Sequence, residues 1–425
     1  MVQTKTFVMT AAFAAALAGR VDAADWPQFR GPNHDGTSPE KILTTWPADG
    51  LRAIWKQPLT DGFSALTVGD GKAFTEVKRA VEGTDQELCV ALDADTGKEL
   101  WSAPLGLAKY DGGGDSGAPG NTGGDGPRST PAYDSGKVYV YSSQMVLKCL
   151  DAATGHQVWA CDVIREHDGQ NIRWESAASP VVEGKWVFIA GGGPGQALLA
   201  FDKNDGKVAW KGQDDKMTQS TPMVATILGR RQVIFFTQKG LVSVTPETGE
   251  VLWRYPYKFQ GSTAMTPLVS GDTVYCSAGY GIGTSACKIT KTNSGFEASR
   301  LWFQPANVLE NHWSTPVCSD GYVYGIGGQA QHATAPLVCV ELATGKIAWT
   351  HNGFGPGGCT LVDGCVLVLS DSGDLVLVKA TPDSYQEVAR SHVLAGKCWN
   401  SAGVSGGRIY ARSTREGVCV SVARP

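Results

Sequence analysis

Hydrophobic and polar positions alternate along this chain in short runs, and each run ends at a turn rich in Gly, Asp and Thr. Such alternation is typical of β-strands that bury one face. One pattern recurs five times: an apolar run, a turn glycine, and a tryptophan four residues later. It predicts a β-hairpin whose glycine supplies a positive φ and whose tryptophan packs on a neighbouring unit. The glycine–tryptophan pairs are Gly97–Trp101, Gly155–Trp159, Gly206–Trp210, Gly249–Trp253 and Gly345–Trp349.

A second hairpin precedes each of these units, as at Ser129–Ser143, Ser179–Gly192 and Ser314–Gly328. Two hairpins make a four-stranded sheet, which is the size of one propeller blade. Successive unit tryptophans, from Trp55 to Trp349, are 43 to 58 residues apart, which is also one blade's length.

The two ends of the chain complete the count of blades. A degenerate seventh unit covers residues 358–390, with Val388 near the tryptophan position, and an eighth at 400–423 ends after three strands. The expected strand Leu51–Leu59 has no hairpin before it and can supply the missing one. We therefore predict an all-β fold over residues 51–425: an eight-bladed β-propeller of four-stranded antiparallel blades, with the ring closed by the N-terminal strand. A row of separate sandwich domains is the alternative, but it would not need an orphan strand at one end and a matching gap at the other.

The N-terminus has the layout of a secretory signal. Lys5 precedes an apolar core at Phe7–Leu17, and small residues surround Ala23. We expect cleavage near Ala23, which gives a signal peptide at 1–23, an N-terminal extension at 24–50, and a periplasmic or secreted protein. The alternative is a buried N-terminal helix. No later apolar run is long enough to suggest a membrane span.

Composition narrows the possible partners. The formal charge is -4 and no run of Lys and Arg could neutralise a row of phosphates, so nucleic acid is not expected as a partner.

The eleven cysteines cannot all pair within one chain. We interpret most of them as small apolar filler rather than disulfides.

Beyond the hairpins, three further stretches carry a resemblance: DWPQFRGP at 25–32, GDGPRSTP at 124–131, and the glycine-rich run at 191–195. With the hairpins, they resemble the tryptophan-docking repeats of the pyrroloquinoline-quinone (PQQ) type propeller superfamily, from about Trp26 to Val422. The chain looks similar to secreted "PQQ-binding-like" proteins of the planctomycete type. In outline it also resembles the propeller subunit of the outer-membrane barrel assembly machinery. The resemblance implies fold and export, whereas function must be argued from a site.

Motifs for common chemistries are absent from the sequence. There is no pair of adjacent cysteines, no Cys-x-x-Cys-His haem site, no His-Glu-x-x-His zinc site and no phosphate loop. Asp93-Ala94-Asp95 begins like a calcium loop, but Pro104 stands at the final ligand position, so we interpret it as a turn. Residues 403–407 match a nucleophile elbow by pattern only, and they align with hairpin turns.

Propellers usually bind ligands at the end of the ring axis where the inner strands begin. A ring of aromatic side chains with one Arg, one Glu, one His and two amides could hold a flat polar ligand or an extended peptide. Ordinary packing of the channel mouth by large side chains explains the same residues. Likewise, the glycine-rich loop 109–128 is either a flap over this mouth or a solvated insertion. The candidate ligand-binding residues are Arg128, Gln219, Trp313 and Asn400 at matching positions, with Trp174, Glu175, His312 and Trp399 nearby.

Two functions remain open from the sequence. The first is a monomeric, non-catalytic scaffold that binds a peptide, a glycan or a partner protein. The second, which the resemblance implies, is a PQQ-dependent dehydrogenase of alcohols or sugars. In that case Arg128 and Gln219 would hold the quinone carboxylates, Trp313 or Trp399 would stack on the quinone, and Glu175 or His312 would be the base. No residues form a convincing calcium cage for that cofactor, so no cofactor is assigned.

Overall fold

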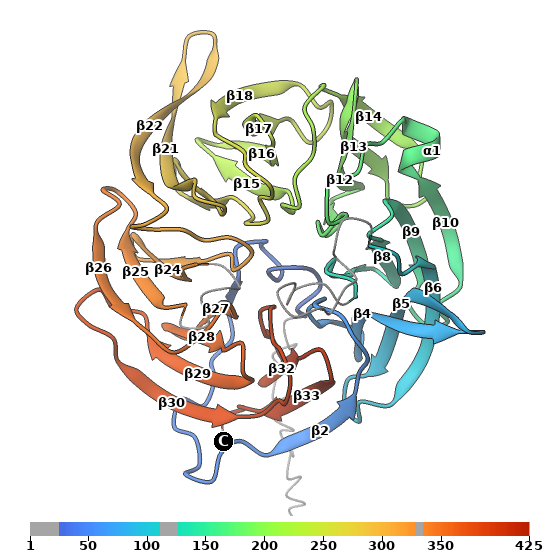
Figure 1. The fold of residues 1–425 in the computed structure, drawn as a ribbon, viewed down its shortest axis with the longest axis vertical. Coiled ribbons are helices and arrows are strands. Elements are labelled where there is room, and N and C mark those ends of the chain that lie inside the picture. Colours follow the sequence, from blue (N-terminus) through green and yellow to red (C-terminus); the bar gives the residue numbers. More distant parts are fainter. Residues whose placement is uncertain (1–24, 111–125, 329–334, 425) are drawn as a thin grey trace, which may run out of the picture.

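The computed structural model describes residues 25–110, 126–328 and 335–424. Eight sheets surround a central axis, which confirms the predicted propeller (Figure 1). Seven sheets have their four antiparallel strands in sequence order from the axis outward, whereas blade 8 takes its outer strand from the N-terminal part of the chain. Blade 7 carries a fifth strand, which is parallel to its neighbour. The signal peptide and most of the glycine-rich loop lie outside the described residues, and the division of the chain at residue 51 stays a prediction.

The first four blades follow the chain from Thr67. Blade 1 is β3 (Thr67–Gly69), β4 (Lys72–Val81), β5 (Thr84–Asp93) and β6 (Glu99–Leu107). Blade 2 is β7 (Ala132–Asp134), β8 (Lys137–Tyr141), β9 (Val146–Asp151) and β10 (Gln157–Asp162), followed by the helix α1 (Val163–His167). Blade 3 is β11 (Val181–Glu183), β12 (Trp186–Gly193), β13 (Gln196–Asp202) and β14 (Val208–Gly212). Blade 4 is β15 (Met223–Ile227), β16 (Arg230–Thr237), β17 (Gly240–Val244) and β18 (Val251–Pro256).

The remaining blades include the two irregular ones. Blade 5 is β19 (Leu268–Ser270), β20 (Thr273–Ala278), β21 (Gly283–Thr292) and β22 (Gly295–Pro305). Blade 6 is β23 (Val317–Ser319), β24 (Tyr322–Ile326), β25 (Leu337–Glu341) and β26 (Ile347–His351). Blade 7 is β27 (Gly358–Val362), β28 (Cys365–Leu369), β29 (Asp374–Lys379) and β30 (Glu387–His392), with β1 (Thr37–Ser38) added to β27. Blade 8 is β31 (Gly403–Ser405), β32 (Arg408–Arg412) and β33 (Glu416–Ser421), completed by β2 (Ala53–Pro58).

The ring is closed by strands from the two ends of the chain. Strand β2 pairs antiparallel with β33, with Trp55 opposite Cys419, and so supplies the outer strand that the C-terminus lacks. In Figure 1 the blue β2 lies beside the red β33. This confirms the expected role of the N-terminal strand. The helix α1 has only five residues, and no helix in the described ranges is long and apolar enough to cross a membrane.

Docking tryptophans join each blade to the next. The tryptophan near the start of an outer strand packs against the turn glycine of the following blade. This contact explains why the repeat carries both a turn glycine and a tryptophan. The indole N–H also donates to a main-chain oxygen of that turn, at 2.8–3.1 Å, in six blades. These bonds run from Trp55 to Ala94, Trp101 to Ala152, Trp159 to Lys203, Trp210 to Pro246, Trp302 to Leu342, and Trp349 to Thr381.

Two blades depart from this docking. In blade 4, Trp253 donates instead to the side chain of Gln232 in its own sheet, at 2.7 Å, because blade 5 has a long outer hairpin in place of the short turn. In blade 7, Ala389 pairs in the sheet where the other blades have tryptophan. The N-terminal segment compensates there: its Ile42 and Trp46 pack into the core that blades 7 and 8 share.

A glycine substitution tests the docking. Adding a Cβ at Gly206, whose φ is +71°, would place it 2.6 Å from the ring of Trp159. Gly136 has a similar φ of +79° and nothing within 4 Å of the added atom. Because overpacking costs about 1–3 kcal/mol, Gly206→Ala should lower the free energy of unfolding by that much more than Gly136→Ala. Urea denaturation of both variants measures the difference, and equal losses would contradict the docking role of this contact.

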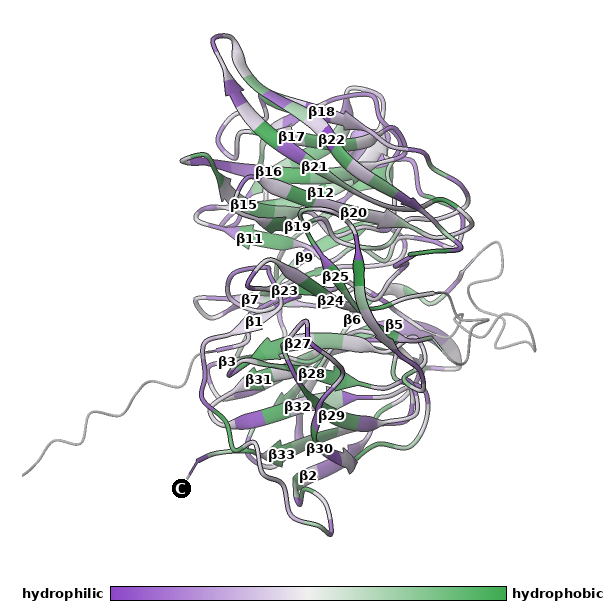
Figure 2. Ribbon diagram, turned by 90° about the vertical axis from the view of Figure 1, so that its left-hand side faces the viewer, coloured by the Kyte–Doolittle hydropathy of each residue, from purple (hydrophilic) through white to green (hydrophobic). Residues whose placement is uncertain are grey.

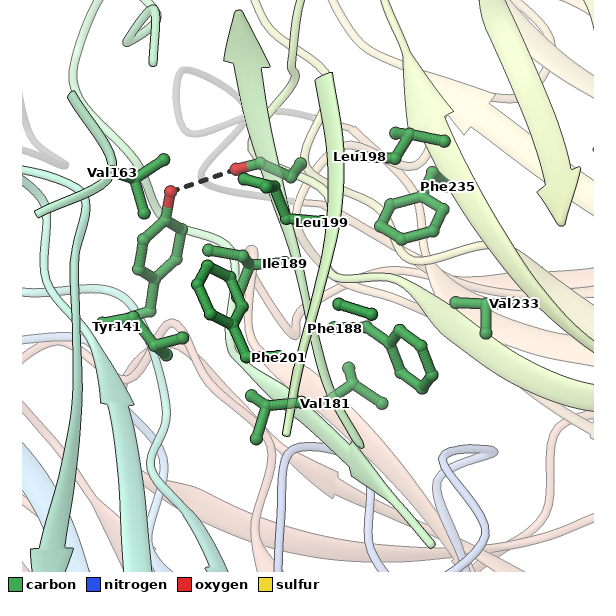
Figure 3. Close-up of a cluster of buried hydrophobic side chains, with 14 of the residues drawn as sticks. Tyr141, Val163, Val181, Phe188, Ile189, Leu198, Leu199, Phe201, Val233 and Phe235 are labelled. Atoms are coloured by element: carbon green, nitrogen blue, oxygen red, sulfur yellow. Dashed lines mark hydrogen bonds between the residues drawn. The ribbon is translucent and has the colours of Figure 1, made fainter. Parts of the chain in front are cut away.

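The core lies between neighbouring sheets. Figure 3 shows side chains of blades 2, 3 and 4 interdigitating, with Tyr141 donating to the main-chain oxygen of Ala190 at 3.0 Å. In Figure 2, the hydrophobic residues, drawn in green, lie mainly on the strands. All eleven cysteine thiols are free and ten are buried, in agreement with their interpretation as apolar filler.

Hydroxyl side chains fasten the inner strands to one another. Each of them directly precedes the proline before an inner strand, and each accepts a main-chain N–H from the preceding blade. The bonds are 2.9–3.0 Å long: Ala65 to Thr130, Thr130 to Ser179, Ser179 to Thr221, and Thr266 to Thr315. The Ser-x-Pro-like pattern of the sequence therefore has a structural reason.

The N-terminal segment 25–38 runs along the inner strands of the ring, with Trp26 bridged to Val68 and β1 paired with β27. Its backbone accepts from Val68 and Tyr133, and the Gln28 side chain bonds both main-chain groups of Val182. Arg30 donates to the main-chain oxygens of Thr315 and Pro316 at 3.1 and 2.7 Å. The segment thus ties together blades 1, 2, 3, 6 and 7.

Candidate functional site

The eight candidate residues all lie at the end of the axis where the inner strands begin. Arg128 precedes β7, Trp174 and Glu175 precede β11, and Gln219 precedes β15. The remaining four, His312, Trp313, Trp399 and Asn400, precede β23 and β31. Chain segments from five blades therefore converge on one mouth.

Six rings form a continuous series across this mouth, which we call the aromatic arc. Its members are Trp174, Tyr280, His312, Trp313, Trp399 and Phe63, with successive centroids 4.7–5.7 Å apart. Trp174 stacks on Tyr280 with 17° between planes, and Trp399 stacks on Phe63 with 19°. The arc joins blades 3, 5, 6, 8 and 1.

Two members of the arc were missed by sequence reasoning. Phe63 stands before Ser64-Ala65, at the same place as Trp313 before Ser314-Thr315, so the alignment of inner-strand starts could have found it. Tyr280 lies in the turn between β20 and β21 with φ of +60°, and no repeat position marks it.

The polar candidates hold the backbone of the mouth in place. Gln219 donates to the main-chain oxygens of Arg173 and Glu175 at 3.3 and 3.2 Å, and its own oxygen accepts from Ser262. Arg128 donates to the main-chain oxygen of Trp174. These bonds stabilise a strained turn, because Trp174 and Glu175 have φ of 67° and 63°.

The other two polar candidates have local partners. The Glu175 carboxylate accepts from Asn171 at 2.5 Å. Asn400 donates to the main-chain oxygen of Arg412 at 3.2 Å, within blade 8. Both side chains are buried, and these bonds connect them to the local backbone and to a neighbouring side chain.

A cation lies over one ring near each end of the arc. The guanidinium of the exposed Arg173 lies 4.8 Å from the centre of the Trp174 ring, and the ammonium of Lys397 lies 4.7 Å from that of Trp399. His312 in the middle is neutral near pH 7, since burial lowers its pKa to about 4. The surface is thus aromatic with positive charge at its edges.

The buried imidazole predicts acid sensitivity. The pKa of His312 falls from 6.5 unfolded to about 4 folded, so folding favours the neutral form. Its contribution is fully present above pH 6.5 and is lost as pH falls from 6.5 toward 4, up to about 3 kcal/mol. We expect His312→Phe to retain more of its neutral-pH stability at pH 4.5 than the wild type does, in urea denaturation across pH. His351→Phe at an exposed position is the control, and parallel pH profiles for His312→Phe and wild type would contradict the assignment.

The arc and its partners do not fit PQQ with calcium. Trp313 and Trp399 pack on each other at 4.7 Å, and the amide of Gln219 is engaged on both sides. Across the described ranges, no three side chains of His, Cys, Asp or Glu gather in a metal-binding group. We derive no reaction step from these residues.

Comparison with known proteins gives one family and several relatives. The family model described as "Outer membrane protein assembly factor BamB" matches residues 84–350, more than half of the chain. The protein of that name from Shewanella oneidensis is 28% identical over 232 residues, covering 53% of this chain and 56% of the relative. The one from Moranella endobia is 23% identical over 358 residues, covering 80% and 73%. The match thus spans little more than half of the first relative's length.

A quinone alcohol dehydrogenase subunit from Komagataeibacter europaeus is 33% identical, but over 138 residues that cover 30% of this chain and 17% of the relative. Among solved structures, BamB from Moraxella catarrhalis has a TM-score of 0.60 at 15% identity, with 87% and 97% of the two chains covered. The quinohemoprotein alcohol dehydrogenase ADHIIG from Pseudomonas putida HK5 has 0.61 at 15%, with 94% and 80% covered. At these identities both structures support the fold alone.

Proposed function

This chain belongs to the family described as outer membrane protein assembly factor BamB, and from that premise we propose that it is a protein-binding scaffold of the bacterial cell envelope. It is exported by its N-terminal signal and acts in the periplasm or outside the cell. Its partner is a protein that takes part in outer-membrane protein assembly, as the names of the relatives suggest.

The aromatic arc is the observation that carries this proposal. Its rings pack on one another, so the mouth offers a surface rather than an opening for a small molecule. Protein interfaces are enriched in Trp, Tyr and Arg, and residues of these types dominate binding energy. Trp174, Tyr280 and Arg173 bring these types together at one end of the arc.

The test is a photocrosslinking experiment followed by quantitative binding. A photoreactive residue at Arg173 should crosslink in cells to a protein of the outer-membrane assembly machinery. With that partner purified, Trp174→Ala should weaken binding at least tenfold, which corresponds to about 1.4 kcal/mol.

Trp186→Ala is the matched control. Lys185 lies 4.5 Å over the Trp186 ring, so the side-chain chemistry is the same, but this pair lies at the other end of β11 from Trp174. The control should bind as the wild type does. Equal weakening by both variants, or none by Trp174→Ala, would rule out the mouth as the docking surface.

A further inference from the structure

The seam between blades 1 and 2 holds two buried glutamates that the proposed scaffold function does not use. Glu76 on β4 and Glu87 on β5 are both 0% exposed. Glu76 pairs with Cys89, and Glu87 lies two residues from Cys89 on the same strand. The two carboxyl groups therefore point to the same face of blade 1 as diagonal neighbours, within reach of one another.

Glu87 is partly satisfied by its surroundings. Its Oε1 accepts from the Tyr110 hydroxyl at 2.7 Å, and its Oε2 accepts from the main-chain N–H of Ser143 at 3.0 Å. Burial still raises the pKa of Glu87, although these bonds and the positive charge of Arg128 oppose the rise. Each carboxylate oxygen has two lone pairs, so Glu87 keeps acceptor capacity after these bonds.

Glu76 has no such support. Neither of its carboxylate oxygens makes a hydrogen bond of good geometry among the described residues, and the hydroxyls of Ser129 and Ser143 are also left without one. Ser129 lies close enough to oppose the rise in the pKa of Glu76 that burial and Glu87 cause. The two carboxylate oxygens of Glu76 and the hydroxyl oxygens of Ser129 and Ser143 thus lie buried in the same seam as Glu87. Because an uncompensated buried carboxylate costs several kcal/mol, Glu76 must be neutralised either by a bound cation or by a proton.

We propose that this seam binds a Ca²⁺ ion, held by the carboxylates of Glu76 and Glu87 and by the hydroxyl oxygens of Ser129 and Ser143. Donor sets made only of oxygen suit hard cations, and two carboxylates match the charge of a divalent ion. Ca²⁺ accepts monodentate and bidentate carboxylates in a flexible geometry and takes water at the remaining positions, whereas Mg²⁺ demands a near-octahedral site.

The site would join two blades. Glu76 and Glu87 belong to blade 1, while Ser129 and Ser143 belong to the start of blade 2 and to the turn between β8 and β9. Binding to the folded chain alone stabilises it by mass action. The ion would therefore strengthen the blade 1–blade 2 seam next to Arg128, without being part of the aromatic arc.

The experiment uses the full mature chain after treatment with EGTA. We expect Ca²⁺, but not Mg²⁺, to raise the Tm by a few degrees, with half-saturation at about 10⁻⁴–10⁻³ M as in extracellular calcium modules. Bound Tb³⁺ should show luminescence sensitised by nearby Tyr110 and be displaced by Ca²⁺. Glu76→Gln should abolish both responses. Glu99→Gln, which alters a partly exposed ion pair with Arg79, should keep both.

A proton is the competing occupant, and the same measurements separate it from Ca²⁺. If Glu76 is simply held as a neutral carboxylic acid, Ca²⁺ will not change the Tm of the wild type. Glu76→Gln will then match the wild type at pH 5 and exceed it at pH 8. That result would overturn the proposal, as would absence of Tb³⁺ binding to the folded wild type. Should Glu76→Gln fail to fold, Ser129→Ala replaces it and should weaken Ca²⁺ binding at least several-fold.

Discussion

Trp55→Ala should lower the free energy of unfolding by about 3–5 kcal/mol, because it empties a buried site at the joint between the two ends of the chain. Trp55 is 5% exposed, lies on Gly97 of blade 1 and donates to the oxygen of Ala94 at 2.9 Å. It sits on β2, which pairs with β33, so one side chain connects the N-terminal strand, blade 8 and blade 1.

Guanidinium denaturation measures the loss, and limited proteolysis shows where it acts. The first cleavages in Trp55→Ala should fall near the chain ends rather than between interior blades. Trp186→Ala, a half-buried indole outside the docking series, should cost much less. A loss below about 1 kcal/mol for Trp55→Ala would mean that β2 pairing alone closes the ring.

Arg30→Met should cost about 3–5 kcal/mol, since it removes the donor that satisfies several buried main-chain oxygens at once. Arg30 is 4% exposed and donates to Thr315, Pro316, His34 and Asp35. Its burial is deep enough to lower the pKa of the guanidinium to about 10, so it stays charged at neutral pH. The substitution keeps an unbranched apolar stem but removes the guanidinium, so these oxygens lose their donor.

The comparison variant is Arg231→Met, whose side chain is 40% exposed and pairs with Glu183 at 2.8 Å. Surface pairs contribute about 0–1 kcal/mol, so this variant should unfold close to the wild type. Thermal and urea unfolding of both variants give the contrast. Similar losses for the two would show that segment 25–38 does not stabilise the ring through Arg30.

The blades could be predicted from sequence because their signals are local. A turn glycine and a tryptophan four residues apart mark one hairpin, and counting such hairpins fixes the ring. The missing strand at one end and the spare strand at the other were visible for the same reason. The path of segment 25–38 was not visible, since its contacts join residues such as Arg30 and Thr315 that are 285 positions apart.

The location of the candidate residues could be predicted from the sequence, but the arrangement of their side chains could not. The alignment of inner-strand starts put eight residues at one mouth, where the structure also has them. It could not show that the rings stack on each other, because Tyr280 comes from a turn outside the repeat and bridges Trp174 to His312. Stacking between blades depends on the width of the ring, which no single repeat encodes. The burial of Glu76 beside Glu87 was missed because glutamate in a strand is usually solvent-facing.

Docking of six tryptophans, each on the blade that follows its own, gives the molecule a direction of assembly. During synthesis, the indole of such a hairpin stays uncovered until the next blade has formed. The last blade to be completed needs a strand made early, since β2 has no partner in its sheet until β33 is made about 360 residues later. A nascent chain that stops short of Glu416 would therefore keep an open strand edge at its N-terminal side, vulnerable to proteases and to pairing with other chains.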